Sequence, residues 1–174
     1  IEAAETACFP YNLNESQVCH ALRYITWELN GFPGWFERMH QAFSDLAEEA
    51  VLKEMRWELE NTEPENPMHY ILSDVVYRAP WLHVAVAPVI LEWVEANPTH
   101  ININIHHCMH ILVNGDTDPV RLSSLARHQI DSISDPDSIS VWYALRVDCE
   151  PVKGIPELEQ WLTGLNEDTA TRAA

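Results

Sequence analysis

The use of glycine and proline is the feature that most constrains how this chain can fold. Its 174 residues include only 5 Gly, and its 11 Pro fall mostly between segments in which apolar residues recur every three or four positions. Strands joined by tight turns would call for more glycine, because those turns use left-handed backbone conformations. The pattern therefore predicts helices separated by proline turns.

Eight helices are expected from apolar spacing and from short polar or proline residues at their starts. Their approximate ranges are 14–29, 35–60, 68–77, 81–93, 99–113, 118–130, 135–147 and 155–165. In the range 99–113, Ile101, Ile103 and Ile105 also alternate as they would in a strand. A helix is preferred there because a lone strand would have no sheet to join.

Three details of this assignment depend on particular residues. Asn14 or Ser16, Asp118 and Asp135 are expected to cap helices, and Pro156 is expected to open the last one. The long helix over 35–60 should turn one apolar stripe inward. That stripe consists of Phe36, Met39, Phe43, Leu46, Ala50 and Trp57.

The predicted fold is all-α, a single-domain irregular or orthogonal bundle of about seven or eight helices. Residues 80–95 include few polar positions and should form a central apolar helix. Residues 1–13 are expected to be an irregular N-terminal segment, 14–165 a single helical domain and 166–174 a loose tail. No internal repeat of 20 to 50 residues emerges from the apolar pattern, which argues against a regular solenoid.

The net charge is the second strong feature, with 27 Asp and Glu against 10 Lys and Arg, or −17 at pH 7. A charge of this sign repels phosphate backbones and anionic membranes, so direct nucleic-acid or membrane binding is not expected. Acidic surfaces attract basic proteins and raise association rates. The alternative is that the acidity serves solubility alone.

The densest run of carboxylates lies in 45–65 and is interrupted by Lys53 and Arg56. With an aromatic anchor, such a run would suit a basic protein surface. The candidate acidic face consists of Asp45, Glu48, Glu49, Glu54 and Glu58, together with Trp57. Part of a second acidic set, on turns between the later helices, has a structural explanation because carboxylates favour helix starts.

Histidines are concentrated in 100–110, where four of the nine occur. If this segment is helical, His106 and His110 lie one turn apart with His107 beside them, a spacing that offers imidazoles to zinc or another transition metal. A further ligand would have to come from another helix. Neighbouring carboxylates could instead raise the histidine pKa values and make the cluster sensitive to acid. The structural alternative is that these are ordinary polar histidines.

No enzyme motif is recognisable, neither a nucleophile elbow, a phosphate-binding glycine loop, a dinucleotide fingerprint nor a His-Glu-x-x-His pair. The four cysteines form no Cys-x-x-Cys pair and are expected to be free, buried thiols in a reducing, cytoplasmic compartment.

The most apolar stretch, 84–91, is too short to span a bilayer.

The sequence therefore predicts an acidic, non-enzymatic protein-binding domain that engages a basic protein surface, as an inhibitor, immunity protein or adaptor would. No cofactor is required for that role. The alternative is a helical metalloprotein with a site centred on His106, His107 and His110.

Overall fold

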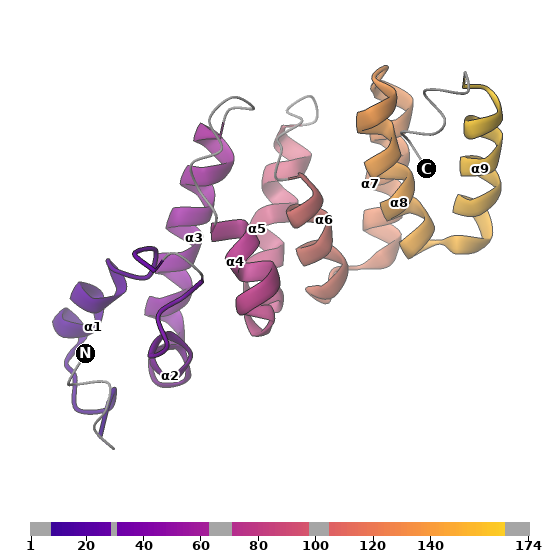
Figure 1. Cartoon of the computed structure of the whole chain (residues 1–174). Helices are drawn as coiled ribbons and strands as arrows, with labels where there is room; N and C mark the ends of the chain where they lie inside the picture. Colours follow the sequence, from indigo (N-terminus) through magenta and orange to yellow (C-terminus); the bar gives the residue numbers. More distant parts are fainter. Residues whose placement is uncertain (1–7, 29–30, 63–70, 98–104, 166–174) are drawn as a thin grey trace. The chain divides into compact units, whose positions relative to one another are not determined.

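The computed structural model describes residues 8–28, 31–62, 71–97 and 105–165. Within these ranges the chain forms helices and no strand, which confirms the all-α prediction (Figure 1). The helices are α1 (Glu15–Leu22), α2 (Phe36–Ala42), α3 (Ser44–Asn61), α4 (Ile71–Arg78), the short 3₁₀ helix η2 (Pro80–Leu82), α5 (His83–Ala96), α6 (Ile105–Asn114), α7 (Pro119–Ser132), α8 (Pro136–Cys149) and α9 (Pro151–Thr163).

The chain divides into two compact units, residues 1–86 and 87–174. In the first unit α3 packs against α1, α2 and α4, and in the second α8 packs against α6, α7 and α9. Each unit buries apolar side chains of its own, such as Val51 and Met55 on α3 and Leu145 on α8. The boundary falls inside α5, and the single domain over 14–165 stays a prediction.

Side-chain caps start three of the helices, as the sequence predicts. Asn14 accepts a hydrogen bond from the amide of Gln17 at 3.0 Å, and the Gln17 side chain accepts one from the amide of Asn14 at 2.9 Å. Asp118 accepts from the amide of Val120 at 3.0 Å, and Asp135 from that of Ser138 at 2.9 Å. These carboxylates are explained by capping and need no partner outside the chain.

The predicted helix over 35–60 is two helices, because Phe43 leaves the helical region with φ −143° and ψ 58°. The amide of Phe43 completes α2 by donating to Met39, and its carbonyl begins α3 by accepting from Ala47. The break changes which face of α3 is buried. The predicted inner stripe is therefore wrong beyond Met39. The buried apolar positions of α3 are Ala47, Val51, Met55 and Leu59.

The last helix begins at Pro151 and contains Pro156 in its interior, so the predicted start at residue 155 is wrong. Proline is favoured in the first helical position because its missing N–H has no helical partner there. Pro151 and Pro156 could each mark a first helical position. The sequence prediction used Pro156, whereas the helix begins at Pro151.

Other boundaries agree less fully or fall outside the described residues. Helix α1 ends at Leu22, before the expected residue 29, and continues as turns in which Tyr24 and Ile25 donate to carbonyls three residues earlier. The starts of the expected helices at 68 and 99, most of the segment 1–13 and the tail 166–174 lie outside the part of the chain that the structure describes.

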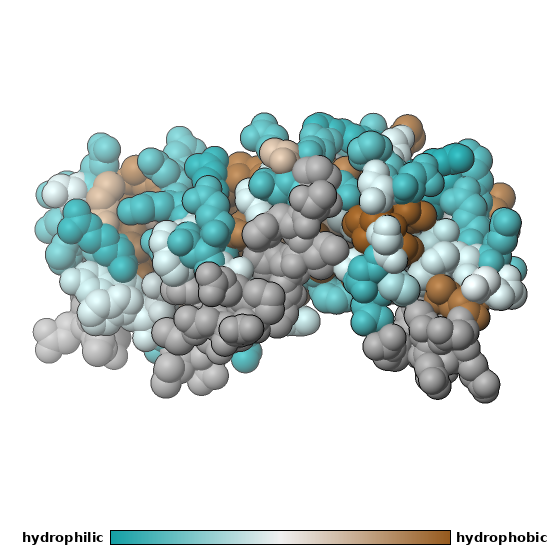
Figure 2. Space-filling view, turned by 90° about the horizontal axis from the view of Figure 1, so that it is seen from above, coloured by the Kyte–Doolittle hydropathy of each residue, from teal (hydrophilic) through white to brown (hydrophobic). Residues whose placement is uncertain are grey.

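The exposed surface of the described residues is mostly hydrophilic, with separate hydrophobic patches in the view of Figure 2. In the described ranges no single helix has both the length and the apolar content to cross a membrane. The pair Ile71–Arg78 and Pro80–Ala96 meets those criteria only when taken together, and its two members are bent by 102°.

Candidate functional site

The predicted acidic face lies on α3, but the structure does not bring all of its members to one surface. Asp45, Glu49 and Trp57 are exposed, and Glu54 is half-buried. Glu48 lies 2.9 Å from Nε2 of His40, on α2. The carboxylates of Asp45, Glu49 and Glu54 have no ion pair within 4.0 Å in the described chain.

Glu58 does not belong to this surface, because its side chain is only 1% exposed. One carboxylate oxygen accepts a hydrogen bond from the amide of Leu72 at 3.0 Å. That amide is in the first turn of α4 and has no acceptor within its own helix. Glu58 therefore joins α3 to the start of α4, and its assignment to a docking face is a correction.

We expect Glu58→Ala to lower the free energy of unfolding by about 1–2 kcal/mol, because the Leu72 amide would stay buried without this acceptor. Glu58→Gln keeps an acceptor oxygen and should lose less. Urea unfolding followed by circular dichroism measures both. Glu49→Ala, on the exposed side of the same helix, is the control and should change stability by less than about 0.5 kcal/mol. Equal losses for Glu58→Ala and Glu49→Ala would contradict this role.

A cleft of about 530 Å³ on α3 is lined by Glu49, Glu54 and Trp57 of the candidate face, but not by Asp45 or Glu48. Trp57, whose side chain is 45% exposed, contributes to the lining of this cleft. Its charged lining residues are Glu49, Glu54 and Glu60 together with Lys53 and Arg56. The two cations interrupt the acidic run, as the sequence suggested, and neither is within ion-pair distance of a carboxylate among the residues described.

The histidine segment is helical from Ile105, so His106 and His110 do lie one turn apart on α6. Both line a cleft of about 380 Å³ against α8, with Asp148 on its other wall. In the described ranges no group of three or more His, Cys, Asp or Glu side chains is arranged to hold a metal. The predicted metal site on His106, His107 and His110 thus gains no support from the geometry.

The pKa of His107 is lowered, first by burial and then by the neighbouring charges of His106 and His110. This shift favours the neutral imidazole. It is opposite in direction to the rise that an acid sensor next to carboxylates would need.

All four cysteines are free. Cys108 is buried and Cys149 is half-buried, whereas Cys8 and Cys19 are exposed, so the prediction of buried thiols is wrong for two of them. Burial raises the pKa of Cys149, which keeps the thiol protonated and weakly nucleophilic.

A buried arginine that the sequence pattern did not single out organises the packing of α7, α8 and α9. The side chain of Arg146 is 3% exposed, and it donates to Glu157 in a bidentate pair at 3.0 and 3.2 Å. It also donates to Glu150 at 2.6 Å and to the hydroxyl of Ser123. Lys153 lies 2.5 Å from the second oxygen of Glu150.

These contacts shift the pKa values of both carboxylates downward. Hydrogen bonds from Lys153 and then Arg146 lower the pKa of Glu150 from 4.5 to about 2. The hydrogen bonds from Arg146 lower the pKa of Glu157 as well. Both side chains are therefore carboxylates at neutral pH.

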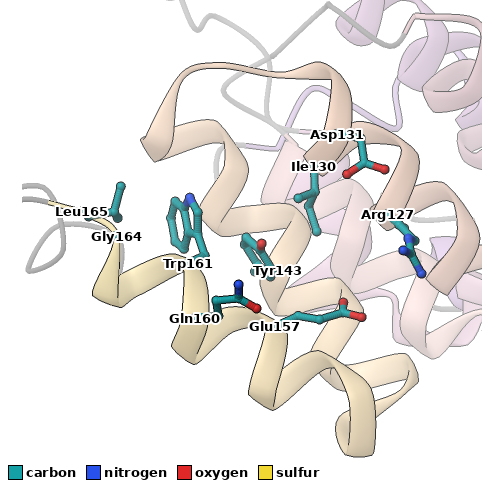
Figure 3. Close-up of a pocket in the computed structure, with 9 residues that line it drawn as sticks. All are labelled: Arg127, Ile130, Asp131, Tyr143, Glu157, Gln160, Trp161, Gly164 and Leu165. Carbon is teal, nitrogen blue, oxygen red and sulfur yellow. The ribbon is translucent and has the colours of Figure 1, made fainter.

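The two carboxylate partners of Arg146 lie at different clefts. Glu157 lines a cleft of about 480 Å³, shown in Figure 3, where the rings of Tyr143 and Trp161 stack at 4.9 Å. Glu150 lines a second cleft of about 370 Å³, and Arg127 on α7 lines both. The sequence signals for this network are the four-residue spacing of Arg146 and Glu150 and the three-residue spacing of Glu150 and Lys153, patterns common on exposed helix faces.

Comparison of the chain with protein-family models, with curated proteins and with solved structures finds no match.

Proposed function

We propose that this protein is a non-enzymatic, acidic protein-binding domain that engages a basic protein surface, as an inhibitor, immunity protein or adaptor does. The observation that supports this function best is the cleft on α3. There the exposed ring of Trp57 lies among Glu49, Glu54 and Glu60, and these carboxylates form no ion pair within the described part of the chain.

The chemistry of this cleft suits arginine and lysine side chains. A cation held over the face of an indole ring is attracted by its π electrons, and nearby carboxylates add Coulomb attraction. Lys53 and Arg56 would in turn pair with acidic groups at the rim of the partner's basic surface. Mixed charges of this kind favour one partner over others, because a wrong partner places like charges together.

The proposal includes the finer architecture expected from the sequence, an irregular bundle around the apolar helix near 80–95. In α5 the side chains of Val86, Ala87 and Ile90 have no exposed area. The opposite face of α5, with Val84, Pro88 and Glu92, is exposed. The buried side chains therefore support an inward-facing side of this helix. The metalloprotein alternative is not proposed, because the described residues bring no third ligand to His106 and His110.

We expect the protein, immobilised and exposed to an extract of its source cells, to retain a basic protein identifiable by mass spectrometry. Binding should weaken by about tenfold or more as salt rises from about 0.05 to 0.5 M, because screening shortens the reach of exposed charges. Trp57→Ala should also weaken binding, since aromatic anchors carry much of the energy of protein interfaces. A partner that binds equally at both salt concentrations, or equally to Trp57→Ala, would contradict the proposal.

A further inference from the structure

The cleft that Glu150 lines has a charge opposite to that of the protein as a whole. It lies where the first half of α7 faces the end of α8 and the start of α9. Its charged residues are three cations, Arg127, Arg146 and Lys153, and one carboxylate, Glu150. The whole chain has 27 acidic residues and only 10 Lys and Arg. Nearly a third of its basic side chains therefore meet at one cleft, which we call the cation cleft.

Glu150 occupies this cleft in the way that a bound anion would. Its carboxylate receives Lys153 Nζ at 2.5 Å, Arg146 Nη1 at 2.6 Å and the Ser123 hydroxyl at 3.0 Å. Proteins bind phosphate and carboxylate groups with donors of this kind, namely a guanidinium, an ammonium and a hydroxyl that point to one anion. The Glu150 side chain is 34% exposed, so it borders solvent.

The charges in the cleft exceed what the fold requires. Arg146 already has a full bidentate partner in Glu157, at 3.0 and 3.2 Å, outside the cation cleft. Arg127 is exposed and forms no ion pair within 4.0 Å in the described ranges. With Glu150 turned away and Glu157 balancing Arg146, the cleft would keep two positive charges, those of Arg127 and Lys153.

We propose that the cation cleft binds the phosphate group of a small phosphomonoester, and that Glu150 fills the site when no ligand is bound. A phosphomonoester carries about −1.5 to −2 charges at neutral pH, which matches the two cations left in the cleft. The volume of about 370 Å³ is that of a small-molecule site. The phosphate replaces the Glu150 carboxylate on Lys153 and Ser123, and Arg127 closes over it from α7.

The net charge of the protein does not prevent such binding. At physiological ionic strength exposed charges are screened beyond about 8 Å, so the acidic surface elsewhere acts only weakly on a ligand inside the cleft. The long-range repulsion reduces the association rate more than the affinity. This inference is independent of the proposed function, because the cation cleft shares no residue with the α3 cleft.

Inorganic phosphate is the probe, and titration calorimetry with the full chain measures its binding. We expect saturable binding of phosphate to the native protein. Glu150→Gln should bind about tenfold more tightly, because it removes the carboxylate that competes with phosphate for Lys153 and Ser123. Arg127→Ala should bind about tenfold more weakly, because it removes one charge-assisted contact to phosphate. Arg121→Ala removes an exposed arginine from the same helix, outside the cleft, and is the matched control. It should bind phosphate as the native protein does.

Acetate is the second probe, and it should bind more weakly than phosphate because it carries one charge. The proposal is overturned if native protein and Glu150→Gln both fail to bind phosphate, if Arg121→Ala weakens binding as much as Arg127→Ala, or if acetate binds as tightly as phosphate. Glu150→Gln also alters contacts of Arg146. Arg127→Ala leaves that network intact, so the comparison with Arg121→Ala tests the site even if the Glu150 variant does not fold.

Discussion

Replacing Arg146 by alanine should lower the free energy of unfolding by about 3–4 kcal/mol, the loss expected when one partner of a buried ion pair is removed. The 3% exposed guanidinium holds two carboxylates and a serine hydroxyl, which come from α7, α9 and the residue that joins α8 to α9. Removing it leaves Glu150 and Glu157 without their main partner. The side chains of Glu150 and Glu157 are 34% and 38% exposed, so water hydrates them in part once the arginine is removed. The loss of unfolding free energy should therefore not exceed about 4 kcal/mol.

Arg121 provides the matched control for Arg146. It makes a bidentate pair with Glu95 at 2.6 and 2.9 Å, but its side chain is 53% exposed. Arg121→Ala should therefore cost much less than Arg146→Ala in the same urea titration. Arg146→Lys should fall between native protein and Arg146→Ala, because an ammonium keeps the charge and loses the bidentate geometry. Equal losses for Arg121→Ala and Arg146→Ala would show that burial of the guanidinium is unimportant.

Replacing Gly154 by alanine should lower the free energy of unfolding by about 2–3 kcal/mol. Gly154 is buried in α9, and a Cβ atom there would lie 2.8 Å from Cα of Val147 and 2.9 Å from the carbonyl oxygen of Arg146. Both atoms belong to the backbone of α8 and cannot move aside as a flexible side chain could. The clash should outweigh the gain of about 1 kcal/mol that alanine usually brings to a helix.

Gly34 is the control for this substitution, because a Cβ built on it has no neighbour within 4 Å. Gly34→Ala should leave stability within about 0.5 kcal/mol of the native protein. Thermal or urea unfolding of the two variants side by side is sufficient. If Gly154→Ala unfolds at the same denaturant concentration as Gly34→Ala, the close approach of α8 and α9 at this position is not as described.

The parts of the fold that the sequence predicts correctly are those decided by local chemistry. Asp118 and Asp135 each precede a proline, and both cap helices as expected. The helix that contains His106 and His110 is correct as well, because a histidine-rich apolar segment with no partner strand has few alternatives.

The predictions fail where tertiary contacts outweigh local pattern. Phe43 fits a continuous helical stripe, yet its backbone breaks the helix and changes the buried face of α3. Glu58 resembles a surface carboxylate because its neighbours are charged. Its buried position depends on α4, because its carboxylate accepts a hydrogen bond from the Leu72 amide. No spacing within α3 contains that information.

The candidate sites were predictable only in part, for the same reason. Trp57 and Glu49 on one exposed surface followed from helical spacing and charge. The cation cleft did not follow, because Arg127, Arg146 and Lys153 lie on three different helices and meet only after α7, α8 and α9 pack. In a chain with so few cations, their grouping in space is more informative than their order in sequence.

The central claim is that carboxylates on α3 recognise a basic partner instead of serving solubility alone. The most direct test is the affinity of the captured partner for two variants with equal net charge, Glu49→Gln/Glu54→Gln/Glu60→Gln on α3 and the control Glu92→Gln/Asp131→Asn/Glu159→Gln at exposed positions elsewhere. We expect the α3 variant to bind about tenfold more weakly or worse, and the control to bind within about twofold of the native protein. Equal weakening of the two would mean that net charge, and not the α3 surface, accounts for the attraction.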